Sequence, residues 1–191
     1  FASLAETASQ VPVRPGETVV AIENRPLSAT AAGDAEGELW SANPVRVLAV
    51  EGDAVKVEIV GWRREGVDSV LYARQGQRIT LASLTDAAVA RLEPLRAVED
   101  ADSGQIWTEA RLDAWVPAGA FLADPAPLWD YVALMYQDNC TLCHVKRSPD
   151  DYKANDWVGH MNSMARLTPL TAQEAGTLLT YLQTRAKDAR Q

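Results

Sequence analysis

The stretch Cys140-Thr141-Leu142-Cys143-His144 contains both cysteines of this chain and one of its two histidines. Cys-x-x-Cys-His is the attachment signature of a c-type haem. On a helix, Cys140 and Cys143 lie three residues apart on nearly the same face. Two thioether bonds can therefore hold the porphyrin edge, while His144 lies beneath the iron as its proximal ligand. The motif predicts one covalently bound haem c.

Two other uses of a Cys-x-x-Cys pair have less support in the sequence. A structural zinc site needs four ligands, whereas the chain offers only these two cysteines together with His144 and His160, without a second cysteine pair. A thioredoxin-like redox motif requires a βαβ context, which the residues around position 140 do not provide. Haem attachment is therefore the preferred hypothesis.

Length and composition are those of a small exported protein. The 191 residues are 47% hydrophobic, enough for one larger domain or two small ones. No stretch approaches the ~20 apolar residues that a membrane span requires. Haem c is attached outside the bacterial inner membrane, so we expect a periplasmic protein. The first residue, Phe1, fits a removed signal, a removed anchor or a trimmed chain, and membrane association is expected only through a partner or a missing anchor.

Charge is unevenly distributed along the chain. Residues 126–191 carry equal numbers of acidic and basic residues, so residues 1–125 hold the whole net charge of -8. Nucleic acid is therefore not an expected partner. Lys146, Arg147 and Lys153 follow the haem motif, and they form either a basic rim for a redox partner or an ordinary solvated surface.

A change of pattern at residues 124–127 predicts a boundary between a β-rich domain, 1–125, and a haem domain, 126–191. Alternating apolar residues at 45–49 and 55–59, joined by a turn at 51–54, predict a hairpin. Further strands are expected at 18–22, 69–74, 78–81, 92–98 and 107–116. Residues 1–17 and 28–38 are rich in small and polar residues and are expected to form an extended arm and loops.

Tryptophans recur in the β-rich part. Residues 55–62 and 108–115 both alternate toward a tryptophan and resemble the strand endings of bacterial SH3-like modules. Trp40, Trp62, Trp107 and Trp115 either line a binding groove or, as is more common in so small a barrel, form its core. The sequence offers neither a nucleophile with a base nor a phosphate-binding loop, so we do not expect an enzyme.

After the boundary the apolar residues recur with a helical period. Residues 128, 131, 132, 135 and 136 predict an amphipathic helix that leads into Cys140. A second helix is expected at 155–166, and a third begins at Thr171, which forms a capping box with Glu174. We therefore predict an α+β fold in which an SH3-like small β-barrel is followed by an all-α class I-like cytochrome c domain.

The sixth iron ligand is left open by the spacing. His160, Met161 and Met164 can each face the iron from one helix. Met135 lies nine residues before His144, about 13 Å along one helix, and cannot reach the opposite side of the iron. A methionine ligand would raise the reduction potential relative to a second histidine. Trp157 is expected to pack on the haem edge and to donate its indole N–H to a propionate.

Several segments together resemble one known family. Residues 57–63, 66–67, 71–76, 129–131, 135–136, 140–144, 154–159, 164 and 170–171 are similar to the C-terminal periplasmic part of the TorC/DorC-type pentahaem c-type cytochromes. In that family, a membrane-anchored tetrahaem segment passes electrons from quinol to a C-terminal monohaem domain. That domain reduces a molybdenum reductase of trimethylamine N-oxide or dimethyl sulfoxide.

The resemblance implies thioether links at Cys140 and Cys143, proximal ligation by His144 and distal ligation by Met164. The chain departs from the family because it has one haem motif and neither a tetrahaem segment nor an anchor. It is therefore expected to be either the C-terminal part of such a protein or a free monohaem relative with another donor.

The expected function is one-electron transfer between periplasmic redox proteins, from a multihaem or quinol-linked cytochrome to a terminal molybdenum reductase. A haem-based sensor of gas or peroxide, or a catalytic haem protein with a labile sixth ligand, is the alternative. A third possibility, with little support, makes the SH3-like half a peptide- or glycan-binding module.

Overall fold

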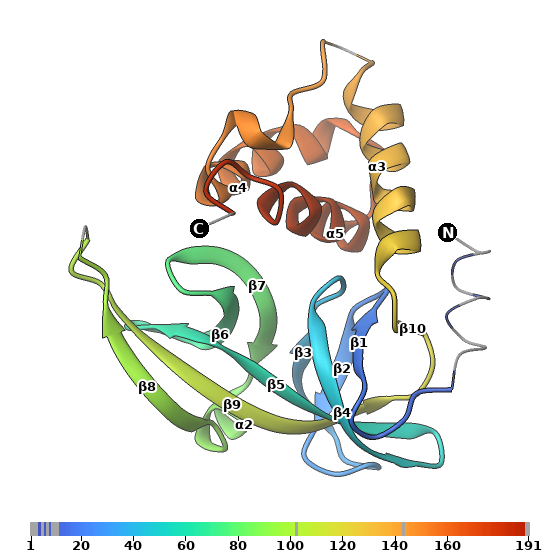
Figure 1. Ribbon diagram of the computed structural model, residues 1–191, viewed down its shortest axis with the longest axis vertical. Helices are drawn as coiled ribbons and strands as arrows, with labels where there is room; N and C mark the ends of the chain where they lie inside the picture. Colours follow the sequence, from blue (N-terminus) through green and yellow to red (C-terminus); the bar gives the residue numbers. More distant parts are fainter. Residues whose placement is uncertain are drawn as a thin grey trace.

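The computed structural model describes residues 4, 6, 8, 12–101, 103–142 and 144–189. Ten strands precede three longer helices, and the helices gather at one end of the sheet (Figure 1). The strands are β1 (Thr18–Ala21), β2 (Arg25–Ser28), β3 (Ala35–Leu39), β4 (Pro44–Glu51), β5 (Ala54–Arg64), β6 (Val67–Arg74), β7 (Gln77–Leu84), β8 (Glu93–Glu99), β9 (Ile106–Pro117) and β10 (Phe121–Leu122). The helices are α2 (Asp86–Ala90), α3 (Ala126–Cys140), α4 (Ala154–Met164) and α5 (Ala172–Gln183), with short 3-10 turns at Pro149–Asp151 and Ala165–Leu167.

Six of the strands form a closed barrel. The hydrogen-bonded order β5-β6-β7-β3-β2-β9 returns to β5, because β5 and β9 also pair with each other. Closure removes the free edges from these six strands. Strand β8 extends the sheet beyond β9, and β4, β1 and β10 extend it beyond β5.

Strands β5 and β9 are the longest elements of the sheet. They pair antiparallel from Ala54 opposite Pro117 to Arg64 opposite Trp107. Alternate residues of β5, Val55, Val57 and Ile59, point into the barrel core and are fully buried. The predicted hairpin of residues 45–59 is confirmed as β4 and β5, which pair across the turn from Glu51 to Ala54.

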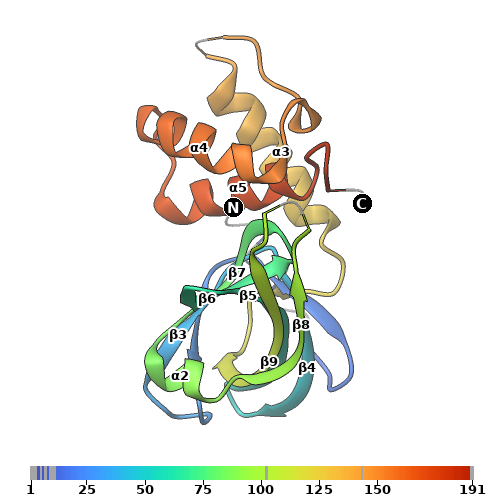
Figure 2. The ribbon, with the colours of Figure 1, turned by 90° about the vertical axis from the view of Figure 1, so that its left-hand side faces the viewer.

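A second hydrophobic core lies between the barrel and the helices. Val19 and Ala21 belong to the barrel core, whereas Val20 and Ile22 belong to the core that contains the buried faces of α3, α4 and α5. Because successive side chains of a strand point to opposite faces, β1 forms one wall of both cores. The two residues of β10 face different cores in the same way: Phe121 belongs to the barrel core and Leu122 to the core with the helices. The helices accordingly lie over this end of the barrel in both views (Figure 2).

The predicted fold class is wrong. The chain is mostly β, with 39% of its residues in strands and 29% in helices, around a closed six-stranded barrel. It is not a small SH3-like barrel followed by an all-α class I-like cytochrome c domain. Two features explain the error. Strand β3 lies largely within residues 28–38, which were expected to be loops, and the helices share their core with β1 and β10 instead of enclosing one of their own.

The helical boundaries follow the sequence pattern closely. Helix α3 buries Leu128, Val132, Met135 and Tyr136 and ends at Cys140. Thr171 caps α5: its side chain accepts a hydrogen bond from the Glu174 N–H at 3.2 Å, and the Glu174 carboxylate accepts one from the Thr171 N–H at 2.8 Å. The predicted capping box is therefore confirmed. The predicted domain boundary between residues 125 and 126 falls immediately before α3 and stays a prediction.

Replacing Gly37 by alanine should destabilise the barrel. A Cβ at Gly37 would overlap the carbonyl oxygen of Ser83 and lie 3.2 Å from the Leu84 Cα, at the point where β3 pairs with β7. We expect Gly37→Ala to lower the free energy of unfolding by about 1–3 kcal/mol in denaturant titrations, the usual cost of overpacking.

The matched control is Gly159→Ala in α4, where an added Cβ meets no atom within 4 Å among the described residues. Alanine in a helix interior should raise the free energy of unfolding by about 0.5–1 kcal/mol. Equal effects of the two substitutions would contradict the close approach of β3 and β7.

Candidate haem site

Helix α3 brings the haem motif to the surface at its C-terminal end. Cys140 is the last residue of the helix and is half-buried. Thr141 follows it, and its hydroxyl donates to the Gln137 carbonyl oxygen at 2.9 Å. Cys143, predicted as the second thioether, lies outside the described residues.

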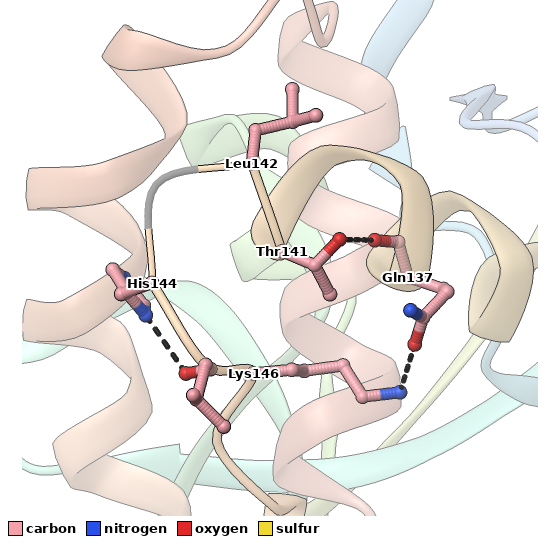
Figure 3. Close-up of a pocket in the computed structure, with 6 residues that line it drawn as sticks. Gln137, Thr141, Leu142, His144 and Lys146 are labelled. Carbon is pink, nitrogen blue, oxygen red and sulfur yellow. Dashed lines mark hydrogen bonds between the residues drawn. The ribbon is translucent and has the colours of Figure 1, made fainter.

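An open hollow of about 650 Å³ lies beside the end of α3 (Figure 3). Its lining comes from α3 and the loop that follows: Gln137, Thr141, Leu142, His144, Val145 and Lys146. Leu142 and Val145, the two apolar residues of this lining, are 76% and 88% exposed. The volume of the hollow lies in the range of about 300–1,000 Å³ that is typical of cofactor sites, and its lining combines two apolar residues with four polar ones.

His144 has one ring nitrogen committed to the backbone. Its Nδ1 lies 2.9 Å from the carbonyl oxygen of Val145. A carbonyl oxygen can only accept, so Nδ1 is the donor of this contact, and in the neutral ring Nε2 then keeps its lone pair. Metal-binding histidines usually donate the other ring N–H to such an acceptor, which fixes the tautomer and the ring orientation. The donor set thus fits haem iron, with Nε2 as the nitrogen able to bind it.

Burial controls the ionisation of Cys140. Desolvation raises the pKa of its thiol, and the nearby Lys146 ammonium opposes this effect only in part. The thiol rather than the thiolate is therefore the favoured form in the folded chain.

The loop after the motif is attached to α3 by polar contacts. The Tyr136 hydroxyl donates to the Arg147 carbonyl oxygen at 2.9 Å, and burial raises the pKa of this phenol to about 12. The Lys146 ammonium donates to the Gln137 side-chain oxygen at 2.8 Å and lies 5.4 Å from the centre of the Tyr136 ring. The sequence left Lys146 open between a basic rim and an ordinary solvated surface. It did not predict the contact with Gln137, because the spacing carries no signal for the loop conformation.

The candidate distal ligands lie on α4 and differ in burial. Trp157, His160, Met161 and Met164 are spaced i, i+3, i+4 and i+7, which places them on one stripe of the helix. Met161 is buried in the core that the helices share with β1. Met164 ends the helix with 41% of its surface exposed. Within the described residues, none of these four side chains lines the hollow.

Aromatic contacts fix the other two members of this stripe. The Trp157 indole N–H donates to the Pro149 carbonyl oxygen at 2.8 Å. The sequence predicts that this N–H donates to a haem propionate, whereas in the structure its acceptor is the backbone. The Tyr152 ring packs against both Trp157, at 5.1 Å between ring centres, and His160, at 4.1 Å. The loop that starts at the haem motif therefore lies against this stripe before it enters α4.

Comparison with known proteins identifies the family. The profile of the family described as "TorC third cytochrome c domain" matches residues 13–121, more than half of the chain. The chain belongs to this family. The matched residues cover the sheet and end before α3, so the barrel is itself the recognised part of a TorC-type cytochrome domain.

Curated relatives extend the similarity across the haem motif. The "Cytochrome c-type protein TorC" of Escherichia coli (strain K12) is 35% identical over 176 residues, which are 91% of this chain and 45% of the relative. The "Cytochrome c-type protein TorY" of Haemophilus influenzae is 34% identical over 139 residues, 73% of this chain and 38% of the relative. The chain thus spans less than half the length of these relatives. No solved structure matches the chain significantly.

The helices of the described residues were also compared with the requirements of a membrane span. None of them is both long enough and apolar enough to cross a bilayer.

The raised pKa of Cys140 predicts slow alkylation of the haem-free protein. In a Cys143→Ser variant without haem, Cys140 is the only thiol, and its reaction with iodoacetamide should increase with pH around a midpoint above the ~8.5 of an ordinary cysteine. The reason is that burial disfavours the thiolate, the reactive form.

The same variant in denaturant is the control for this measurement. Unfolding removes the burial, so the midpoint should fall to the ordinary value. Identical midpoints in the folded and unfolded protein would contradict the half-buried position of Cys140 at the end of α3.

Proposed function

We propose that this chain binds one covalently attached haem c and transfers single electrons. The observation that carries the proposal is the donation from His144 Nδ1 to the Val145 carbonyl oxygen, which in the neutral ring leaves Nε2 for iron, next to Cys140 and an open hollow. Membership of a cytochrome c family supports the same conclusion. No substrate is transformed by the chain in this proposal.

The residues around the hollow have separate tasks. Cys140 and Cys143 hold the porphyrin through thioether bonds, and the backbone acceptor of Val145 orients the His144 ring. Leu142 and Val145 offer apolar surface that excludes water from the macrocycle. When bound, the haem supplies an iron that alternates between the ferric and ferrous states.

Met164 is the distal ligand that we favour. Met161 is committed to the shared core with 6% of its surface exposed, and the His160 ring is packed against Tyr152. The Met164 thioether, at the end of α4 and 41% exposed, is the candidate with the fewest competing contacts. The resemblance to the TorC/DorC-type cytochromes supports the same residue.

We propose a periplasmic location and two redox partners. The donor is a multihaem or quinol-linked cytochrome, and the acceptor is a terminal molybdenum reductase, as in the pentahaem family that the sequence resembles. The names TorC and TorY of the relatives support a place in such a chain of redox proteins. Arg147 and Lys153, which follow the haem motif in sequence, are exposed and would contact an acidic partner surface.

One observation favours the alternative of a sensor or catalytic haem with a labile sixth ligand. The hollow is open, and its described lining includes no candidate of α4. A ligand that binds weakly from α4 would leave this position accessible to a gas or a peroxide.

Ligand binding by purified protein tests the proposal. Material from a host competent in cytochrome c maturation should contain one haem per chain by pyridine-haemochrome absorbance, and the reduced protein should bind carbon monoxide poorly. We expect Met164→Ala to increase carbon monoxide binding at least tenfold, because the sixth position of the iron becomes free. Haem absorption spectra follow the reaction.

Met161→Ala is the matched control. It should reduce stability by about 2–5 kcal/mol, since it leaves a cavity in the core, but should leave the affinity for carbon monoxide unchanged. Protein without covalently bound haem would contradict the proposed function. Rapid binding of carbon monoxide by the unmodified protein, with no effect of Met164→Ala, would favour the sensor.

A further inference from the structure

The first turn of α4 is attached to the barrel by an unusual set of side chain to backbone hydrogen bonds. The partner is the turn between β6 and β7, which lies next to α4 and the C-terminal end of the chain in Figure 1. This contact is distant from the haem motif and was not assigned a role by the sequence.

Asn155 makes the central contact. Its side-chain oxygen accepts from the Arg78 N–H at 2.7 Å, and its side-chain amide donates to the Gly76 carbonyl oxygen at 2.8 Å. The amide thus pairs with the hairpin as a peptide group would, using both its donor and its acceptor. Gly76 has a φ of 74°, which favours glycine and sets the direction of this carbonyl. The Arg78 guanidinium adds a bond to the Asn155 carbonyl oxygen at 3.3 Å.

A second buried amide repeats the arrangement from α5. Gln183 is 1% exposed, and its amide donates to the carbonyl oxygens of Arg78 and Ala154, at 3.1 and 3.0 Å. The Ala154 N–H, at the start of α4, donates to the Asp188 carboxylate at 2.8 Å. The same end of α4 is therefore fixed both to the barrel and to the segment after α5.

We infer that Asn155 is a positioning residue for the distal ligand of the haem. The inference rests on the proposed function. Asn155 and Met164 lie nine residues apart on one helix, about 13 Å along its axis. Because a short helix behaves as a rigid rod, fixing its first turn to the barrel sets the direction in which its last turn presents the Met164 thioether. Through this contact the barrel holds the ligand that α4 supplies.

The contact should determine how readily the ligand leaves the iron. In the proposed site, the Met164 thioether would compete with an added molecule such as imidazole for the sixth position of the iron. The apparent affinity for imidazole would therefore rise as the state without bound Met164 becomes more populated. Removing the Asn155 amide eliminates two hydrogen bonds between α4 and the hairpin, which together change such an equilibrium by roughly tenfold.

Imidazole binding to the ferric protein tests the inference. We expect Asn155→Ala to raise the apparent affinity for imidazole roughly tenfold, with covalent haem content unchanged by pyridine-haemochrome absorbance. Asn155→Asp keeps the acceptor for the Arg78 N–H and loses the donor to Gly76, so a rise of about threefold is expected. If Asn155→Ala does not fold, the imidazole affinity of Asn155→Asp is the measurement that tests the inference.

Asn162→Ala is the matched control, because this asparagine of the same helix is exposed and its side chain makes no hydrogen bond to the described residues. Its imidazole affinity should stay within twofold of the unmodified protein. Hydrogen exchange of the haem-free proteins gives an independent readout: the α4 amides should exchange faster in Asn155→Ala than in Asn162→Ala.

Each outcome addresses a different claim. Equal imidazole affinities and equal α4 exchange in the Asn155 and Asn162 variants would overturn the positioning role, even with haem in place. Absence of covalent haem in the unmodified protein would instead refute the proposed function. If Met164→Ala leaves imidazole binding unchanged, the distal assignment fails and so does the link from Asn155 to Met164.

Discussion

The structure depends on a strand that is buried on both faces. In β1, Val19 and Ala21 pack inside the barrel, while Val20, together with Ile22 just after the strand, packs against the helices. Burying both faces of one short strand excludes water from two cores at once and makes each core a support for the other. Helix α3, which ends at the first cysteine of the haem motif, follows shortly after β10, which pairs with β1. The position of the haem motif is therefore set by the barrel.

Polar contacts add direction to this apolar attachment. Apolar packing alone is non-directional and tolerates small rotations of a helix. The buried amide of Gln183 and the half-buried amide of Asn155 each require a specific donor or acceptor of the β6–β7 hairpin. A misplaced helix would leave these groups unpaired, at a cost larger than the gain from a typical hydrogen bond. The combination suits the proposed site, in which His144 and Met164 would supply iron ligands from different elements.

Much of the local structure could be predicted from the sequence, and the global arrangement could not. The period of α3, the hairpin at 45–59 and the capping box at Thr171 are local signals, and the structure confirms them. Strand β3 has only Leu39 buried, and its polar sequence gave no apolar alternation to detect. The apolar run at 19–22 indicated a buried strand but not what covers its second face. The motif singles out Cys140 and His144 as a prediction, whereas the contacts of Asn155 depend on residues far apart in sequence and have no local signal.

The central claim is that the barrel and the helices α3, α4 and α5 are stabilised as one unit by the wall that β1 and β10 form. The most direct test is unfolding of the haem-loaded protein in denaturant, followed by haem absorption and by hydrogen exchange of the β5 and β9 amides in the same samples. The account predicts a single transition with the same midpoint for both probes. Loss of the native haem spectrum at a lower denaturant concentration, while β5 and β9 remain protected, would contradict it.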